Sequence, residues 1–182
     1  MIQPTIKGRK LPLNDWEGDD RTPGAGGHYV TCTDTAAGRM VAYVTNGRIV
    51  KDGKVYRAAL PHPDADGITL AQAALAIYVV SGLTLYIPAG WDSAHVKTHL
   101  RAGRGLIVQG AYAAIPRQYR YQANAGFNHA MWVSHISGTS VRVWDPLNPR
   151  IHEYGATMPL TVLLDFLATL HNSVAYVPLE AL

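Results

Sequence analysis

The chain has 182 residues, of which 48% are hydrophobic and 16% are charged, and this balance fits one globular domain and excludes a disordered protein. The formal net charge is +3, and the basic residues are scattered, so the sequence does not predict nucleic-acid binding. Cys32 is the only cysteine, which excludes an intramolecular disulfide and a cysteine-rich zinc site.

The sequence shows neither the pattern of a transmembrane helix nor that of a secretion signal. No stretch approaches the roughly 18 consecutive apolar residues of a transmembrane helix. The first residues lack the apolar segment of a signal peptide. We therefore expect a protein that is made in the cytoplasm and has no membrane span.

The N-terminal part is predicted to be an extended arm over residues 1–27, because Pro, Gly and Asp are frequent there. A single domain over residues 28–182 is expected to follow. Its first helix is predicted from Cys32 to about Thr45, with Thr31 or Thr33 as its cap, since small and apolar residues recur at helical spacing.

The middle of the chain is predicted to contain helices and short apolar strands, separated by turn residues. A loop is expected first, and Thr69 is expected to cap the helix that follows it. The predicted elements are a loop over residues 48–67, helices over 70–80 and 92–102, and strands over 83–87 and 105–109.

The C-terminal part is predicted to begin with a long loop over residues 111–128 that is rich in Tyr and Arg. A β-hairpin follows, because two alternating segments flank the turn residues Ser137 and Gly138. The predicted elements are strands over residues 129–136 and 139–144, a helix over 160–171 and a closing strand over 174–177. Helices followed by antiparallel strands indicate the α+β class.

Cys32 is the first candidate for chemistry, since it lies at the predicted start of a helix. The helix dipole and the unpaired amides of the first turn favour the thiolate form of a cysteine there. A lone cysteine in a helix is more often a small buried hydrophobe, however. Position alone therefore does not decide between the two readings.

His129 and Asp145 lie at the two outer ends of the predicted hairpin. A hairpin brings its outer ends together, so the carboxylate can orient the imidazole toward a thiol. The combination of helix start and hairpin ends follows the logic of a catalytic triad. Taken singly, the histidine could be a strand-edge residue and the aspartate part of a plain turn.

The order of these segments resembles the papain-like cysteine peptidases of the bacteriocin-leader-processing (double-glycine peptidase) type. The resemblance rests on residues 32–41, 67–70, 100–110, 129–133 and 141–146, which contain the cysteine helix, a Gly-Ile-Thr segment, an apolar strand, and a histidine followed by Asp-Pro. It implies a papain-like fold in which an N-terminal helix packs on an antiparallel sheet. It also implies that Cys32 is the nucleophile, His129 the base and Asp145 the orienting residue, with no metal or cofactor.

The sequence departs from this family at the group that stabilises the oxyanion. The family usually has a glutamine about six residues before the cysteine, where this chain has Gly26, and a glycine after it, where this chain has Thr33. An oxyanion donor lowers the barrier by about 3 kcal/mol. The backbone amide of Cys32, together with His28 or Thr31, is a candidate replacement.

Aromatic residues of the long loop are candidates for a substrate cleft, although they could equally pack the loop onto the domain. The candidates are Tyr112, Tyr119 and Phe127. His95 and His99 have a spacing that can bind zinc, but a solvated helix face is the favoured reading. His135 is a second candidate base, ranked below His129 because it lies near the hairpin turn.

Two functions are consistent with these observations. The first is a cysteine peptidase or amidase that cleaves peptide amides of bacterial peptidoglycan, because the chain is similar to phage lysins and tail-associated proteins with this domain. The second is a virion structural component, such as part of a tail tip, that retains the fold without the chemistry. The partners expected are a peptide substrate and, in the second case, other phage tail proteins.

Overall fold

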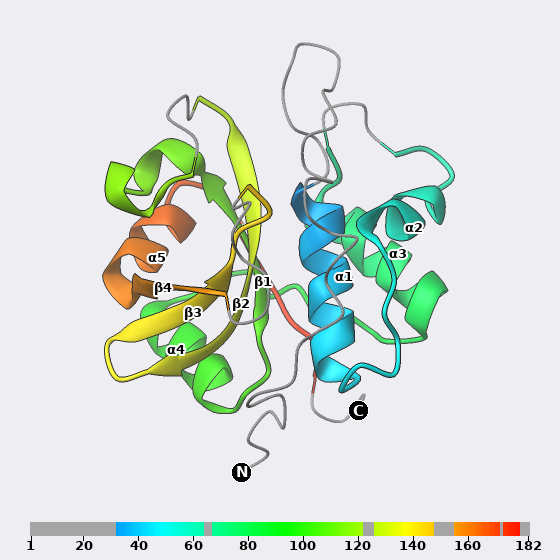
Figure 1. Ribbon diagram of the computed structural model, residues 1–182, viewed down its shortest axis with the longest axis horizontal. Coiled ribbons are helices and arrows are strands. Elements are labelled where there is room, and N and C mark those ends of the chain that lie inside the picture. Colours follow the sequence, from blue (N-terminus) through cyan, green and yellow to red (C-terminus); the bar gives the residue numbers. More distant parts are fainter. Residues whose placement is uncertain (1–31, 64–66, 122–125, 148–154, 172, 179–182) are drawn as a thin grey trace.

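The computed structural model describes residues 32–63, 67–121, 126–147, 155–171 and 173–178. The predicted N-terminal arm, residues 1–27, lies outside these ranges. Within them, an antiparallel sheet with strand order β4-β3-β2-β1-β5 lies between two groups of helices (Figure 1). No helix of the described part is long and apolar enough to cross a membrane.

The described elements follow one another along the chain as helices first and mainly strands afterwards. The helices are α1 (Cys32–Val44), α2 (Gly53–Ala58), α3 (Leu70–Ser81), α4 (Ser93–Arg101) and α5 (Leu160–Leu167). The strands are β1 (Leu106–Ala111), β2 (Asn128–Ser137), β3 (Ser140–Trp144), β4 (Ala156–Pro159) and β5 (Val174–Ala175). The predicted α+β class, with a cysteine-bearing helix packed on an antiparallel sheet, is confirmed.

Side-chain caps explain where several helices begin. The Thr69 hydroxyl accepts the Gln72 amide, and the Gln72 side chain accepts the Thr69 amide, so α3 opens with a capping box. The Asp92 carboxylate caps α4 by accepting the His95 amide. After α1, Gly47 has a positive φ of 76°, and the helix ends at Val44, close to the predicted Thr45.

The structure corrects three of the predicted elements and adds one strand that was not predicted. The predicted loop over residues 48–67 contains α2, which is capped by the Asp52 carboxylate. Residues 83–87 form no strand, and only Tyr86 makes a bridge, with Tyr176. Strand β4 was not predicted, and α5 is shorter than the helix predicted over residues 160–171. Helix α2 is too short to show a clear helical period, and β4 is defined by its pairing with β3 and not by its local pattern.

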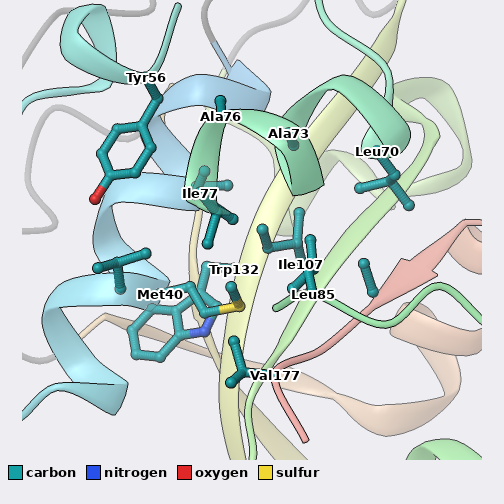
Figure 2. Close-up of a cluster of buried hydrophobic side chains, with 14 of the residues drawn as sticks. Met40, Tyr56, Leu70, Ala73, Ala76, Ile77, Leu85, Ile107, Trp132 and Val177 are labelled. Carbon is teal, nitrogen blue, oxygen red and sulfur yellow. The ribbon is translucent and has the colours of Figure 1, made fainter. Parts of the chain in front are cut away.

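One hydrophobic core fills the space between the sheet and the helices α1, α2 and α3 (Figure 2). Trp132 and Ile107 contribute from the sheet, while Met40 of α1 and Ile77 of α3 meet them from the helices. All four side chains are fully buried. Burial of each contributes about 1.5–3 kcal/mol, and this packing fixes α1 against β2.

A second core lies on the opposite face of the sheet, beneath α4 and α5. Val108 and Met131, the sequence neighbours of Ile107 and Trp132, point into it because side chains alternate along a strand. Gly110 of β1 lies under α5, where a Cβ would collide with the Phe166 carbonyl. The glycine therefore permits the close approach of α5 to the strand that pairs with β2.

The hairpin of β2 and β3 sets the positions of two predicted site residues. Trp132 pairs with Trp144, and a register shift, typical of a β-bulge, lies between Val133 and His135. Continuing the register by one residue sets Asp145 on the face of the sheet that also carries His129. The two residues are therefore diagonal neighbours at the outer end of the hairpin.

Candidate catalytic site

Cys32 is the first residue of α1, and its side chain is buried with 7% of its surface exposed. The neighbouring helix α2 braces this first turn. Arg57 donates to the buried Asp34 carboxylate at 3.0 Å. Gly53 lies so close that a Cβ there would stand 2.9 Å from the Thr35 amide nitrogen. The start of α1 is thus held in place by an ion pair and by close backbone packing.

His129 and Asp145 meet as the hairpin predicted. The distance from Nε2 of His129 to Oδ1 of Asp145 is 2.7 Å, and both side chains are almost fully buried. A carboxylate only accepts, so Nε2 carries the proton and donates it to Asp145. Nδ1 is then the ring nitrogen that can exchange a proton with the Cys32 thiol.

The Asp145 carboxylate has hydrogen-bond donors on both oxygens. Oδ1 also accepts the Leu147 amide at 2.9 Å, and Oδ2 accepts the Tyr112 hydroxyl at 3.0 Å. The Tyr112 oxygen in turn accepts the Tyr121 amide at 2.9 Å. These bonds fix the carboxylate in the plane that orients His129.

The electrostatics of His129 favour its protonated form. Burial lowers the pKa of His129, but the Asp145 carboxylate raises it by its charge and by its hydrogen bond. Hydrogen bonding and charge of Cys32 raise it further, so the pKa of His129 stands well above the ordinary value of 6.5. An imidazolium beside a cysteine stabilises a thiolate, which is the nucleophilic form.

We expect a specific pH dependence of stability from this shift. Because the pKa of His129 is higher in the folded than in the unfolded state, its contribution is complete below pH 6.5. The contribution declines as pH rises from 6.5 through the raised value. Urea denaturation across this range should show a steeper decline of the free energy of unfolding in the parent protein than in His129→Gln. Equal slopes would contradict the prediction.

The structure locates three other predicted site residues, and it leaves two outside the described ranges. His28 and Thr31, the oxyanion candidates, are the two outside. Tyr112 is fully buried and contacts Asp145, so it lies beneath the site and not in an open cleft. Phe127 is half-buried and stacks on Tyr112, with 5.4 Å between ring centroids. It also makes a T-shaped contact with His129, with 6.1 Å between ring centroids.

Tyr119 lines a pocket of about 240 Å³ beside Asp145. The pocket is formed by the segment after β1 and by strands β3 and β4. Its lining residues are Gln118, Tyr119, Tyr121, Val143, Asp145, Ala156, Thr157 and Met158. Apolar side chains and neutral hydroxyls dominate this lining, and Asp145 contributes the carboxylate.

Tyr112→Phe is expected to lower the rate of amide hydrolysis about tenfold, because a hydrogen bond to a charged group is worth about 1.5–3 kcal/mol. The substitution removes the donor to Oδ2 of Asp145 and leaves the ring packing intact. Initial rates at several pH values would measure the effect. Tyr78→Phe, on the exposed surface of α3, is the matched control and should retain the full rate. Equal rates in both variants would contradict a role for Tyr112.

His95 and His99 do not form the solvated face that was predicted. His99 is buried, and its Nε2 lies 2.7 Å from Nε2 of His95. Nδ1 of His99 faces the Arg104 guanidinium at 3.2 Å and must accept from it. Burial, His95 and Arg104 together lower the pKa of His99 to about 4. Because Nδ1 of His99 accepts from Arg104, it carries no proton, so His99 lacks the Nδ1–H that usually donates to a second residue when Nε2 of a histidine binds a metal.

Two further residues of the site were not predicted. Gln109 of β1 donates to Thr33 of α1, next to Cys32, and Arg57 pairs with Asp34. Gln109 is the polar residue of an otherwise apolar strand, which is a signal that the sequence offers. His135, the second candidate base, contacts Ser134 near the turn. Among the described residues, no group of three or more His, Cys, Asp or Glu could hold a metal ion.

Comparisons with known proteins bear on the fold. No family model matches the sequence, and no curated protein is significantly similar to it. The structure is similar to that of a candidate C39-like peptidase from Bacillus anthracis, with a TM-score of 0.63 and 10% sequence identity. The similarity covers 96% of this chain and 100% of the other. The chain has a C39-peptidase-like fold.

Proposed function

We propose that the chain is a cysteine peptidase or amidase that hydrolyses a peptide amide. The observation that carries the proposal is the buried series of hydrogen bonds from Tyr112 through Asp145 to His129. Cys32 raises the pKa of the same imidazole by its charge and by hydrogen bonding. A nucleophile, a base and an orienting carboxylate in this order are the requirements of acyl transfer by a thiol. The fold shared with a candidate C39-like peptidase supports the same reading.

The geometry suggests a conventional two-step reaction. The Cys32 thiolate attacks the amide carbonyl carbon and forms a tetrahedral intermediate. His129 donates the proton on Nδ1 to the leaving amine as the C–N bond breaks, which leaves a thioester on Cys32. Water gives a proton to Nδ1 of His129 and attacks the thioester, and collapse of the intermediate releases the carboxylic acid and regenerates the Cys32 thiolate beside the protonated imidazole.

The oxyanion requires hydrogen-bond donors near Cys32. The backbone amide at the start of α1 has no partner within the helix, because the first amides of a helix lack acceptors there. It is therefore our first candidate donor. His28 and Thr31 remain the sequence-based candidates for the second donor.

For the substrate, we propose the peptide part of bacterial peptidoglycan, cleaved by a phage lysin or a tail-associated enzyme. The basis for this proposal is the resemblance of the sequence motifs described above to those of phage proteins that carry this domain. In such a setting the enzyme would reach the wall from within the infected cell or as part of the virion tail. Other tail proteins are then its expected partners.

Incubation of purified protein with isolated cell walls would test the substrate class. We expect new free amino groups to appear over time, and Cys32→Ala is the matched control that should release none. Hydrolysis of a different peptide without any release from cell walls would reject peptidoglycan as the substrate and would support the peptidase activity. Release by the Cys32→Ala variant would contradict the mechanism.

A second candidate function is a structural component of a phage virion, and the burial of the reacting groups favours it. Cys32 is 7% exposed and His129 is 2% exposed, so little of either group meets solvent. Gly26 in place of the family's glutamine points the same way. A thiol that resists alkylation near neutral pH in the folded protein would favour this candidate, and a reactive thiol would favour the enzyme.

A further inference from the structure

The side chain of Gln109 joins three segments that are far apart in the sequence. Its Nε2 lies 3.0 Å from the hydroxyl of Thr33 in α1 and 3.4 Å from the carbonyl oxygen of Ile68, just before α3. Gln109 belongs to β1, where the next residue, Gly110, pairs with His129. One side chain therefore connects the strand beside His129 with the residue beside Cys32.

The direction of these hydrogen bonds can be assigned from chemistry. The Ile68 carbonyl only accepts, so the atom of Gln109 that faces it is the amide nitrogen, which only donates. The Thr33 oxygen must then accept from Gln109. Thr33 keeps its own hydroxyl hydrogen for another acceptor, and it is 2% exposed, so solvent offers little competition.

The Cys32 sulfur is an acceptor within reach of this hydrogen. Sγ of Cys32 lies 4.0 Å from Oγ1 of Thr33. This is the outer limit of a hydrogen bond to sulfur. A thiolate accepts more strongly than a thiol, so deprotonation of Cys32 would shorten the contact.

We propose that Gln109 is a positioning residue that, through the Thr33 hydroxyl, stabilises the thiolate of Cys32. By donating to Thr33, Gln109 turns the hydroxyl hydrogen toward the sulfur. It also holds the first turn of α1 at a fixed distance from the strand that pairs with β2. The inference rests on the proposed function, because it takes the thiolate as the reactive form.

We call the proposed path from Gln109 through the Thr33 hydroxyl to the Cys32 sulfur a relay. A hydrogen bond that only holds β1 and α1 together, without acting on the sulfur, would have different consequences. A tie between β1 and α1 affects the melting temperature but acts on Cys32 only through the position of the helix. A relay requires the Thr33 hydroxyl as its middle member. Removing either member of a relay should then have the same effect, and removing both should add little.

The experiment measures alkylation of Cys32 by iodoacetamide from pH 5 to pH 9, with melting temperatures recorded for each variant. We expect Gln109→Met and Thr33→Val each to lower the rate at pH 7 about tenfold, the size expected for loss of a hydrogen bond to a charged group. The double variant should lie no lower than the slower single variant. Thr33→Ser, which keeps the hydroxyl, should restore the parental rate, and Thr161→Val on the exposed face of α5 is the matched control.

Several outcomes would overturn the inference. These are an inert thiol in the parent protein, unchanged rates in folded single variants, and multiplicative losses in the double variant. If Gln109→Met does not fold, equal rates for Thr33→Val and Thr33→Ser would still refute the relay. Alkylation needs no substrate, so a reactive thiol without amide hydrolysis would reject the proposed function and leave the relay standing.

Discussion

Replacement of Cys32 by alanine is expected to abolish amide hydrolysis, with a loss in kcat on the order of 10⁶-fold, as for removal of a catalytic nucleophile. Without the sulfur, the proposed acyl intermediate on Cys32 cannot form. The side chain is small and the helix is braced by Arg57 and Gly53, so the fold should persist. Initial rates together with a melting curve would measure both effects.

Cys32→Ser is the matched control for this loss. The hydroxyl keeps the shape of the thiol, but it does not ionise near neutral pH, so we expect the serine variant to be nearly as inactive. Appreciable hydrolysis by folded Cys32→Ala protein would show that another group attacks the amide. In that case the assignment of Cys32 would be wrong.

Replacement of His129 by alanine is expected to cause a loss of similar size, on the order of 10⁶-fold in kcat. The imidazole is the group that links the thiol to Asp145, at 2.7 Å from the carboxylate. Residues that act as one unit are not additive, so the double variant with Cys32→Ala should be no slower than either single variant. Single-turnover and steady-state rates on the three proteins would test this.

His135→Ala provides the control for His129, because both residues belong to β2 and His135 lies near the turn. We expect its rate to stay within about twofold of the parent protein, as surface changes away from a site usually have small effects. If His135→Ala lost most of its rate of amide hydrolysis and His129→Ala retained it, His135 and not His129 would be the base. Such a result would also contradict the inferred relation between His129 and Asp145.

The parts of the fold that follow local rules were predictable from the sequence. The cysteine helix, the capped helix α3 and the hairpin of β2 and β3 each have a periodic pattern bounded by turn residues. The meeting of His129 and Asp145 follows from the hairpin alone, since a short turn forces its outer ends together. For this reason the imidazole–carboxylate pair was the most predictable part of the site.

The parts that depend on distant contacts were not predictable in the same way. Helix α2 has six residues, which are too few to show the 3.6-residue hydrophobic period of a helix in the sequence. It is stabilised by packing against α1. Strand β4 is defined by its pairing with β3. Tyr112 could be recognised as an aromatic of a loop, but its contact with Asp145 joins residues 33 positions apart.

The contact of Gln109 with Thr33 was not predictable because it joins segments that are far apart in the sequence. The helix that carries Cys32 and the hairpin that carries His129 are separated by about half of the chain. Only their packing in three dimensions shows that a polar residue of β1 reaches Thr33. A polar side chain in an apolar strand indicates such a contact, although it does not identify the partner.

The most direct test of the central claim is the rate of Cys32 alkylation near neutral pH in the parent protein and in His129→Ala. If Cys32 and His129 act as one unit, iodoacetamide should modify the folded parent rapidly at pH 7. The His129→Ala variant should react more slowly by at least about tenfold, because the imidazolium that favours the thiolate is gone. Equal rates in two folded proteins, or a parental thiol that does not react, would contradict the proposed catalytic site.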